Sequence, residues 1–358
     1  MKRETEAAVL VKPGEPLRLM RLSIPELKPG QVLVEVAYSG VCRSQLLEVR
    51  GRRGHDPYLP HTLGHEGSGR VLETGAGVTK VRPGDRVILS WIKGHGADVP
   101  AATYAGPQGQ VNSGAVSTFA RHSVASENRV TPVPDGMALR EAALLGCAVP
   151  TGAGTIFNTA RVKEGDRVAV FGAGGIGLSA VMAAAAAKAS VIVAVDVRDE
   201  ALARARELGA THLVHAGREN PVEVIRCVTG GGVDCAVECA GRRESMEAAF
   251  KAVKNGGGLC VLAGNLPSGE CISIDPFDLI RGRRIVGTWG GETDPDRDIP
   301  LYAAMFLEGR LPLSRLIARE FALEEINLAL DELDAGVLGR GLVDLSLARP
   351  SGPGCASA

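Results

Sequence analysis

Three side chains of this 358-residue sequence carry the donor atoms of a catalytic zinc site. Cys42 lies in Gly-Val-Cys-Arg-Ser, His65 in Gly-His-Glu-Gly and Cys147 in Gly-Cys-Ala. Two thiolates and one imidazole, with the fourth position left open, form the ligand set of a catalytic rather than a structural zinc ion. The three residues lie far apart in the sequence, so their spacing alone does not establish a site. Taken singly, Cys42 and Cys147 could also be buried apolar thiols, and His65 could be a hydrogen-bonded loop residue.

A glycine-rich stretch gives the second chemical signal, because it matches the G-x-G-x-x-G pattern of dinucleotide-binding turns. It follows a predicted buried strand, 167–171, and precedes a predicted alanine-rich helix, 175–188. In this pattern Gly172 permits the tight turn, Gly174 lets the backbone approach a pyrophosphate, and Gly177 lets the helix pack on the strand. The N–H groups at the start of the helix favour phosphate. The predicted dinucleotide site therefore contains Gly172, Gly174, Gly175, Ile176 and Gly177.

Asp196 closes the next predicted strand, 191–195, and stands 19 residues after Gly177. A carboxylate at this place can accept hydrogen bonds from the adenosine ribose hydroxyls, and it repels a 2′-phosphate. We therefore expect NAD in preference to NADP. Arg198, two residues further on, leaves some use of NADP open.

The elements that must position these residues change in character near residue 150. Before it, alternating strands such as 31–37 and Pro-Gly turns indicate a mostly-β region, and 94–117 is expected to be an irregular lobe. After it, continuous apolar strands alternate with helices, which indicates a parallel sheet covered on both faces. Further strands are expected at 233–237 and 259–262, and further helices at 199–208, 299–308 and 324–335. Residues 349–358 are expected to form a frayed tail.

Composition excludes several classes of protein. Forty basic and 41 acidic residues leave a net charge of −1, so no global positive field attracts nucleic acid. No signal peptide or membrane-spanning apolar run is visible, and the eight cysteines form no even framework. We expect a reducing, cytoplasmic compartment. The cysteines outside the zinc set are expected to pack in the core, namely Cys227, Cys235, Cys239, Cys260 and Cys271.

Several motifs occur together, and in order, as they do in the zinc-dependent medium-chain alcohol dehydrogenases. The chain resembles this family from about residue 7 to 347, near the branch of thiol-dependent formaldehyde dehydrogenases. The motifs are GVCRS (40–44), GHEGSG (64–69), GCAVPTGAGT (146–155), VAVFGAGGIG (168–177) and GRGLVDL (339–345). A match to several motifs in order is far more specific than a match to any one of them.

The resemblance implies an α/β chain with a GroES-like, mostly-β catalytic domain and a Rossmann domain with a doubly wound parallel sheet. The expected division is 1–150 for the N-terminal part of the catalytic domain, 151–289 for the NAD-binding domain, and 290–358 for the return to the catalytic domain and the C-terminal tail. The segment 272–290 resembles the family's subunit-pairing region, so a homodimer or homotetramer is expected.

The resemblance also implies roles for individual residues. Cys42, His65 and Cys147 resemble the ligands of the catalytic zinc, Glu66 a carboxylate behind them, and Ser44 the hydroxyl that takes the substrate proton. The other implied roles are pyrophosphate contacts for Arg43 and Arg340, packing against the nicotinamide for Thr151, and the substrate pocket for Gln45, Trp91 and Phe119.

The sequence departs from the family pattern at three places. Residues 90–117 contain no cysteine where many members hold a structural zinc with four, so one zinc per chain is expected. Gln45 replaces the usual aspartate behind the zinc-binding histidine, and its amide would raise the basicity of that ligand less. Leu47 stands where some members carry a proton-relaying histidine. Glu48 and His55 lie nearby, and both are interpreted as exposed residues.

The leading hypothesis is a zinc-dependent oxidoreductase. It would transfer hydride between NAD and a primary or secondary alcohol, polyhydroxylated ones included, through a zinc-bound alkoxide. Two alternatives stay within the fold: a dehydrogenase of a thiol–formaldehyde adduct, and a zinc-free enoyl or quinone reductase. A non-catalytic nucleotide-binding protein is a third class, which Ser44 and Thr151 disfavour. The expected partner is a small alcohol or carbonyl compound, with no nucleic acid and no membrane.

Overall fold

The computed structural model describes residues 3–336 and 339–347, and these form two compact units. The first unit joins the described residues of 1–146 to those of 317–358, and the second spans 147–316. The chain therefore leaves its first unit, builds the second and returns. The tail predicted at 349–358 lies outside the described residues.

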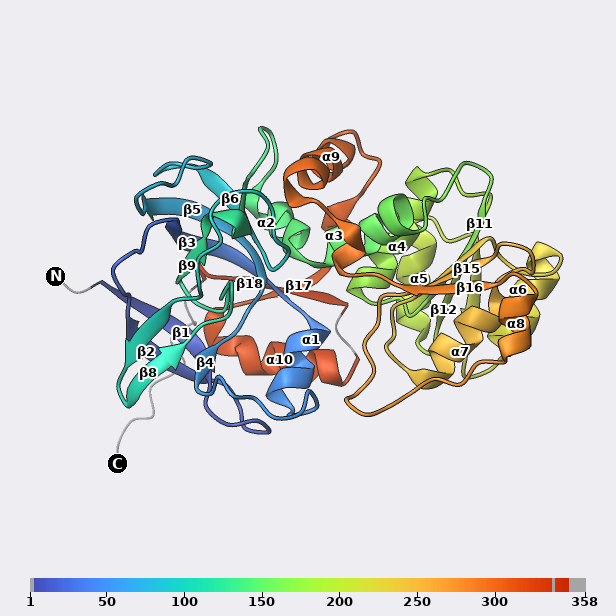
Figure 1. Cartoon of the computed structure of the whole chain (residues 1–358), viewed down its shortest axis with the longest axis horizontal. Helices are drawn as coiled ribbons and strands as arrows, with labels where there is room; N and C mark the ends of the chain where they lie inside the picture. Colours follow the sequence, from blue (N-terminus) through green and yellow to red (C-terminus); the bar gives the residue numbers. More distant parts are fainter. Residues whose placement is uncertain (1–2, 337–338, 348–358) are drawn as a thin grey trace, which may run out of the picture. The chain divides into compact units, whose positions relative to one another are not determined.

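The first unit is mostly β, as predicted (Figure 1). One group of strands closes into a barrel, in the order β1 (Glu4–Leu10), β2 (Arg18–Ser23), β7 (Thr103–Gly106), β8 (Gly109–Asn112) and β4 (His61–Thr62). The second sheet has the order β10 (Val130–Pro132), β6 (Arg86–Ser90), β5 (Glu66–Thr74), β3 (Gln31–Val41), β18 (Arg340–Asp344) and β17 (Ile317–Phe321), and β9 (His122–Ser126) also pairs with β3. Its α-helices are α1 (Arg43–Val49), α2 (Leu139–Ala142) and α10 (Ile326–Asp334).

Strand β3 joins the two ends of the chain. Residues 31–35 pair with β9, and residues 38–41 pair with β18, which comes from the C-terminal segment. The sequence predicted a half-buried strand at 31–37, whereas most of β3 is buried because β5, β9 and β18 all pair with it. The aromatic rings of Phe119 and Phe321 lie fully buried in the same core cluster. Burial of a side chain of this size contributes about 1.5–3 kcal/mol.

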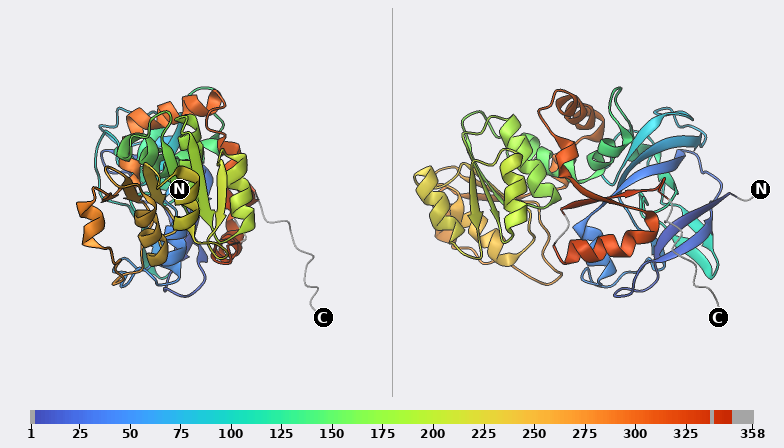
Figure 2. Two further views of the ribbon diagram at one scale, coloured as in Figure 1. Left: turned by 90° about the vertical axis from the view of Figure 1, so that its right-hand side faces the viewer. Right: turned by 180° about the vertical axis from the view of Figure 1, so that it is seen from behind.

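The second unit is a parallel six-stranded sheet with helices on both faces (Figure 2). The strand order is β13 (His212–His215), β12 (Val191–Asp196), β11 (Arg167–Phe171), β14 (Cys235–Glu238), β15 (Leu259–Leu262) and β16 (Arg284–Gly287). Its helices are α3 (Ala148–Gly154), α4 (Gly175–Ala186), α5 (Asp199–Glu207), α6 (Pro221–Thr229), α7 (Arg243–Ala252), α8 (Pro276–Ile280) and α9 (Pro295–Leu307). The order reverses at β11, which is the switch point of a doubly wound sheet.

The structure places the C-terminal boundary of the second unit later than the sequence suggested. The expected boundary followed residue 289, but 290–316 belongs to the second unit. The hydroxyl of Thr293 donates to the Pro150 carbonyl at 2.9 Å, and Asn158 Nδ2 donates to Asp298 Oδ2 at 2.9 Å. These contacts attach helix α9 to residues 148–159, and they join segments about 140 residues apart, which local patterning cannot reveal.

In the part of the chain that the structure describes, the longest α-helix is α9, which spans 13 residues. Among the described residues, no helix has the length and apolarity needed to cross a membrane.

Candidate metal and cofactor site

The three predicted zinc ligands all stand directly before an element of the fold. Cys42 is the N-cap of α1, His65 precedes β5, and Cys147 precedes α3 as the junction between the two units. The backbone of a residue that directly precedes a helix or strand is held in place by that helix or strand, while its side chain lies outside the regular pattern of side chains along it. Sequence distance therefore does not prevent these side chains from meeting.

Two neighbouring residues at the end of β6 hold the backbone on either side of the site. The Trp91 N–H donates to the His65 carbonyl at 3.1 Å, and the Ser90 hydroxyl donates to the Gly146 carbonyl at 2.8 Å. Gly146 lies so close to β5 and β6 that a Cβ there would be 2.3 Å from the Leu89 carbonyl oxygen. Only glycine fits before Cys147, and this fit positions the cysteine.

The candidate ligand atoms converge. One ligand atom from each of Cys42, His65, Glu66 and Cys147 lies within 4.8 Å of the others. In tetrahedral zinc sites with bonds of about 2.0–2.3 Å, the ligand atoms are about 3.3–3.8 Å apart. The observed set therefore needs only a small contraction.

The donor atoms also fit a zinc ion chemically. His65 Nε2 is buried and has no hydrogen-bond partner among the described residues, an arrangement that costs free energy unless the atom is ligated. The thiols of Cys42 and Cys147 are buried. Two sulfur atoms and one imidazole nitrogen are ligands that zinc prefers.

Two polar groups contact this cluster within the first unit. The Ser44 hydroxyl donates to Cys42 Sγ at 3.3 Å, so it lies beside a candidate ligand, where a proton acceptor for the substrate is required. Arg340 forms an ion pair with Glu66, and its side chain is only 5% exposed. Burial lowers the pKa of the Arg340 guanidinium, and the neighbouring Cys42 opposes that shift. Arg340 thus balances charge behind the ligands, and its predicted pyrophosphate contact stays a prediction.

Gln45 acts on the backbone of the histidine rather than on its ring. With the amide turned as its surroundings require, the Gln45 oxygen accepts from the N–H of Gly64 at 2.6 Å and of His65 at 3.1 Å. The sequence led us to consider a hydrogen bond from the imidazole to this amide. The structure shows instead that Gln45 fixes the loop that carries the imidazole.

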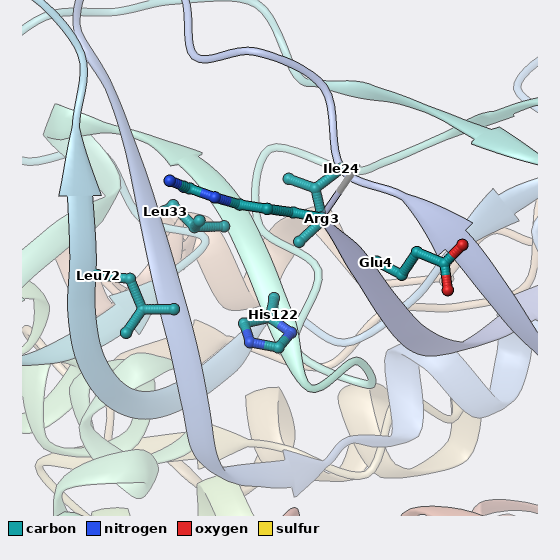
Figure 3. Close-up of a pocket in the computed structure, with 6 residues that line it drawn as sticks. All are labelled: Arg3, Glu4, Ile24, Leu33, Leu72 and His122. Atoms are coloured by element: carbon teal, nitrogen blue, oxygen red, sulfur yellow. The ribbon is translucent and has the colours of Figure 1, made fainter. Parts of the chain in front are cut away.

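A small cavity of the first unit adjoins His65. Its volume is about 130 Å³, and His65 lines it. Two of the predicted pocket residues, Gln45 and Trp91, line it as well. Phe119 is fully buried in the core and is not among the residues that line this cavity, so its pocket role stays a prediction. None of the predicted site residues lines the larger cavity of about 290 Å³ in Figure 3, which is formed by Arg3, Glu4, Ile24, Leu33, Leu72 and His122.

The same small cavity contains a polar cluster that sequence reasoning missed. Glu48 and His61 both line it, and together with Asp56 they place one ligand-type atom each within 4.8 Å of one another. Glu48 was interpreted as an exposed residue, and His61 was assigned no role. Only the pairing of β4 with β1 and the packing of α1 bring the loop 56–61 to Glu48, so no local signal could have identified the cluster.

The glycine turn of the second unit has the predicted geometry. Gly172 has φ of +91°, the left-handed region that favours glycine. A Cβ at Gly177 would be 1.8 Å from the Gly172 oxygen, so helix α4 packs directly on the turn. A Cβ at Gly174 would meet nothing within 4 Å, so the space beside this backbone is open. The turn from Gly172 to Gly177, through Gly175 and Ile176, therefore suits a pyrophosphate at the start of α4.

Other predicted cofactor residues have environments that suit a polar ligand. The hydroxyl oxygen of Thr151 is buried and has no hydrogen-bond partner among the described residues. Arg43 is exposed at the start of α1. The Asp196 carboxylate accepts from the Ala173 N–H at 2.7 Å and the Val197 N–H at 2.8 Å, so it anchors the glycine turn as well as ending β12. Arg198 Nε lies 3.4 Å from Asp196 Oδ1.

The lobe at 90–117 is more ordered than predicted. It contains the antiparallel pair β7 and β8, and its neighbour Glu127 accepts from the N–H groups of Thr79, Lys80 and Ala97 at 2.6–2.8 Å. The Asp98 carboxylate in this lobe forms an ion pair with Lys93 at 2.6 Å. Backbone and carboxylate hydrogen bonds thus hold this lobe.

The cysteines outside the site differ from one another. Cys235, Cys239 and Cys260 lie in or next to the parallel sheet, and burial raises the pKa of all three thiols, that of Cys235 to about 12. Cys235 and Cys260 are packing residues, as expected, whereas Cys239 is only partly buried. Cys227 and Cys271 are exposed, so the prediction that they pack in the core was wrong. Both lie near turns of the second unit, where apolar neighbours in sequence do not imply burial.

These features define a class of protein: an oxidoreductase with a metal site and a nucleotide-binding fold. Comparison with known proteins agrees. Residues 28–135 match the family model of the alcohol dehydrogenase GroES-like domain, and residues 175–307 match that of the zinc-binding dehydrogenases. S-(hydroxymethyl)glutathione dehydrogenase from Photobacterium damsela subsp. piscicida is 33% identical, over 93% of this chain and 97% of that protein.

Solved structures show the same likeness. An alcohol dehydrogenase zinc-binding domain protein from Burkholderia ambifaria is 32% identical with a TM-score of 0.91, covering 97% of this chain and all of that one. Benzyl alcohol dehydrogenase from Acinetobacter calcoaceticus is 29% identical with a TM-score of 0.88, covering 96% of this chain and all of that one. The chain belongs to the zinc-dependent medium-chain alcohol dehydrogenase family, and the predicted fold class is confirmed.

Proposed function

We propose that this protein is an NAD-linked dehydrogenase with one catalytic zinc per chain, which interconverts a primary or secondary alcohol and its carbonyl compound. The observation that carries the proposal is the convergence of the ligand atoms of Cys42, His65 and Cys147. A zinc-free reductase of this fold would not require two cysteines and a histidine with converging ligand atoms. When bound there, zinc supplies a Lewis acid that polarises the substrate oxygen and favours loss of its proton.

The residues around the ligands have three further roles: proton transfer, charge balance and positioning of the backbone. The Ser44 hydroxyl, beside Cys42, accepts the proton that the alcohol loses while it releases its own proton toward solvent. Arg340 and Glu66 neutralise each other's buried charge next to the ligands. Gln45 holds the backbone of the His65 loop in place. Together these contacts keep the ligand geometry constant while substrate enters and leaves.

The second unit binds the cofactor in this proposal. The turn from Gly172 to Gly177 takes the pyrophosphate, with Arg43 and Arg340 as further phosphate contacts. Thr151 packs against the nicotinamide, and its hydroxyl gains a polar partner that it lacks among the described residues. Asp196 binds the adenosine ribose and gives the preference for NAD.

A second substrate class is supported by the names of relatives. Several that are about 33% identical are S-(hydroxymethyl)glutathione dehydrogenases, which act on a thiol–formaldehyde adduct. The 130 Å³ cavity beside His65 is smaller than the pockets of about 300 Å³ or more that hold drug-sized ligands, so in this alternative it holds only the reacting end of the substrate. NADH formation from formaldehyde with glutathione, compared with simple alcohols, distinguishes the two classes.

The protein is also proposed to form a homodimer or homotetramer in a reducing, cytoplasmic compartment. Strand β16 is the last strand of the parallel sheet, and apolar side chains lie exposed on and around it. Ile280 is 76% exposed and Trp289 is 79% exposed. An unprotected sheet edge with exposed apolar neighbours is suited to pairing with another chain.

Substitution of one ligand tests the proposed chemistry. In Cys42→Ala we expect the zinc content, measured by plasma mass spectrometry, to fall from one per chain to nearly none, and turnover to fall about 10³-fold or more because the Lewis acid contributes several kcal/mol. The dissociation constant of NADH should stay within about 3-fold, since the glycine turn is intact. The exposed Cys227→Ser is the matched control and should keep its zinc. Full activity of metal-free protein would refute the proposal.

A further inference from the structure

The cavity beside His65 has a polar wall that the proposed chemistry does not use. His65 and Trp91 line the cavity, and so do Glu48 from α1 and His61 from β4. The side chain of Glu48 is 25% exposed, and that of His61 is 7% exposed. A carboxylate and an imidazole thus face the same small space as a candidate metal ligand.

His61 is held by contacts on both ring nitrogens. Its Nδ1 lies 3.1 Å from the Thr62 carbonyl oxygen. Its Nε2 lies 2.8 Å from Asp56 Oδ2. Asp56 also accepts from the Tyr58 N–H at 2.9 Å. Asp56 and Thr62 therefore orient the ring, and the ring has little freedom left to bind a ligand itself.

Glu48 is placed differently. The nearest nitrogen atoms of basic side chains are His61 Nε2, 3.6 Å from Glu48 Oε1, and Arg53 Nη1, 3.6 Å from Glu48 Oε2. Both distances are longer than a good hydrogen bond. A carboxylate can accept about four hydrogen bonds. Burial raises the pKa of Glu48, while His61 and Arg53 oppose the shift. A donor that enters the cavity would therefore find an acceptor already balanced by two basic groups.

We propose that Glu48, positioned by His61, accepts a hydrogen bond from a second hydroxyl of the substrate and so selects diols and other polyhydroxylated alcohols over simple alkanols. The proposal rests on the proposed dehydrogenase function and specifies its substrate class. Arg53 already pairs with the Glu48 carboxylate at 3.6 Å, so a neutral hydroxyl suits this carboxylate better than a second cation such as an ammonium group. The cavity of about 130 Å³ suits a small polyol.

The test compares pairs of alcohols that differ by one group. Each diol from 1,2-ethanediol to 1,4-butanediol is paired with the alkanol that has a methyl group in place of the second hydroxyl. In the wild-type enzyme we expect kcat/KM for the best diol to exceed that of its partner about 10-fold or more, since a site built for a hydroxyl strongly rejects the analogue that lacks it. In Glu48→Leu this ratio should fall to about one, mainly through a higher KM for the diol.

Two variants control for indirect effects. Glu48→Gln keeps an acceptor oxygen and should retain part of the preference for the diol. Glu26→Leu makes the same exchange at an exposed position of the first unit and should leave the ratio unchanged. The alkanol should keep its kcat/KM within about 3-fold in all three variants, because it does not use Glu48.

A binding measurement separates this inference from the proposed function. In a Trp289→Phe background, Trp91 on the cavity wall is the remaining tryptophan, and its fluorescence reports diol binding without turnover. We expect the dissociation constant of the diol to rise about 10-fold in Glu48→Leu. An active wild type with equal ratios, or with amino alcohols preferred over diols, would overturn the inference and leave the dehydrogenase intact. If the protein turned over no alcohol but bound diols in a way that depended on Glu48, the dehydrogenase function would be refuted and the diol site would be kept.

Discussion

The carboxylate of Asp196, to which we assign the proposed preference for NAD, also holds the shape of the glycine turn. It accepts from the N–H groups of Ala173 and Val197, and Arg198 lies beside it. Asp196 both holds the turn through hydrogen bonds and carries a negative charge. Substitution by alanine would remove both properties, so it could not show which of them sets the cofactor preference. Asparagine removes the charge and keeps one acceptor oxygen, which can still accept from the N–H of Ala173 or from that of Val197, so it disturbs the turn less than alanine does.

At this position we expect Asp196→Asn to weaken the discrimination against NADP. Loss of the negative charge removes its repulsion of a 2′-phosphate and leaves Arg198 to attract one, so the ratio of the dissociation constants of NADPH and NADH should fall about 10-fold, equivalent to about 1.4 kcal/mol. Fluorescence titration measures both constants. Asp199→Asn, on the exposed start of α5, should leave the ratio as it is. An unchanged ratio in Asp196→Asn would show that the preference is set elsewhere.

Among the elements, the turn at Glu127–Arg129 organises the lobe that precedes it. The Glu127 side chain is almost completely buried and accepts from three backbone N–H groups of two distant loops, residues 79–80 and residue 97. Burial by itself would raise the pKa of Glu127, but the hydrogen bonds from Ala97, Thr79 and Lys80 outweigh it, and the pKa is lowered. One carboxylate thus ties together the loops around 79 and 97.

We expect Glu127→Gln to loosen these loops at neutral pH. The amide has one acceptor oxygen and a donor group that faces N–H donors, so the local stability should fall by about 1–3 kcal/mol. The direct measurement is hydrogen exchange at the amides of Thr79, Lys80 and Ala97, which should become faster at pH 7.

The pH dependence gives this prediction a second test. Because the folded pKa of Glu127 is lowered, its ionised form stabilises the fold above the unfolded value near 4.5. That contribution is lost as the pH falls through the folded pKa. The difference in stability between wild type and variant should therefore be full at pH 6–7 and shrink below about pH 4.5. Glu308→Gln, an exposed pair with Arg310, is the control. A difference that did not depend on pH would contradict the assignment.

At the scale of the whole molecule, the edge of the parallel sheet is the surface through which we propose that copies of the chain pair. Strand β16 pairs with β15, and exposed Phe277, Ile280 and Trp289 flank it. Exposed apolar side chains next to an open edge favour association with an identical edge, since pairing satisfies backbone groups and buries apolar surface together.

We expect Ile280→Asp combined with Val286→Asp to convert the oligomer to a smaller species. Buried carboxylates at such an interface cost several kcal/mol unless they are paired. Sedimentation velocity should show a dimer or tetramer for the wild type and a monomer or dimer for the variant. Leu328→Asp changes an exposed apolar residue of α10 and should leave the wild-type species. A wild type that sediments as a monomer would remove the proposed interface.

Local chemistry was sufficient to predict much of this protein. The glycine pattern, the continuous apolar strands and the acid at Asp196 act over short distances, so β11, α4 and β12 were predicted within one or two residues. The order of motifs that resemble a known family likewise gave the fold class and the candidate zinc ligands.

The tertiary structure decided what depends on segments distant in sequence. It attached residues 290–316 to the second unit, turned Gln45 to the backbone of the His65 loop, buried Phe119 in the core and gathered Glu48, Asp56 and His61 at one cavity. Each of these depends on contacts between residues that no local period or motif connects. Periodicity reports which face of an element is buried, whereas only packing between elements determines which side chains meet.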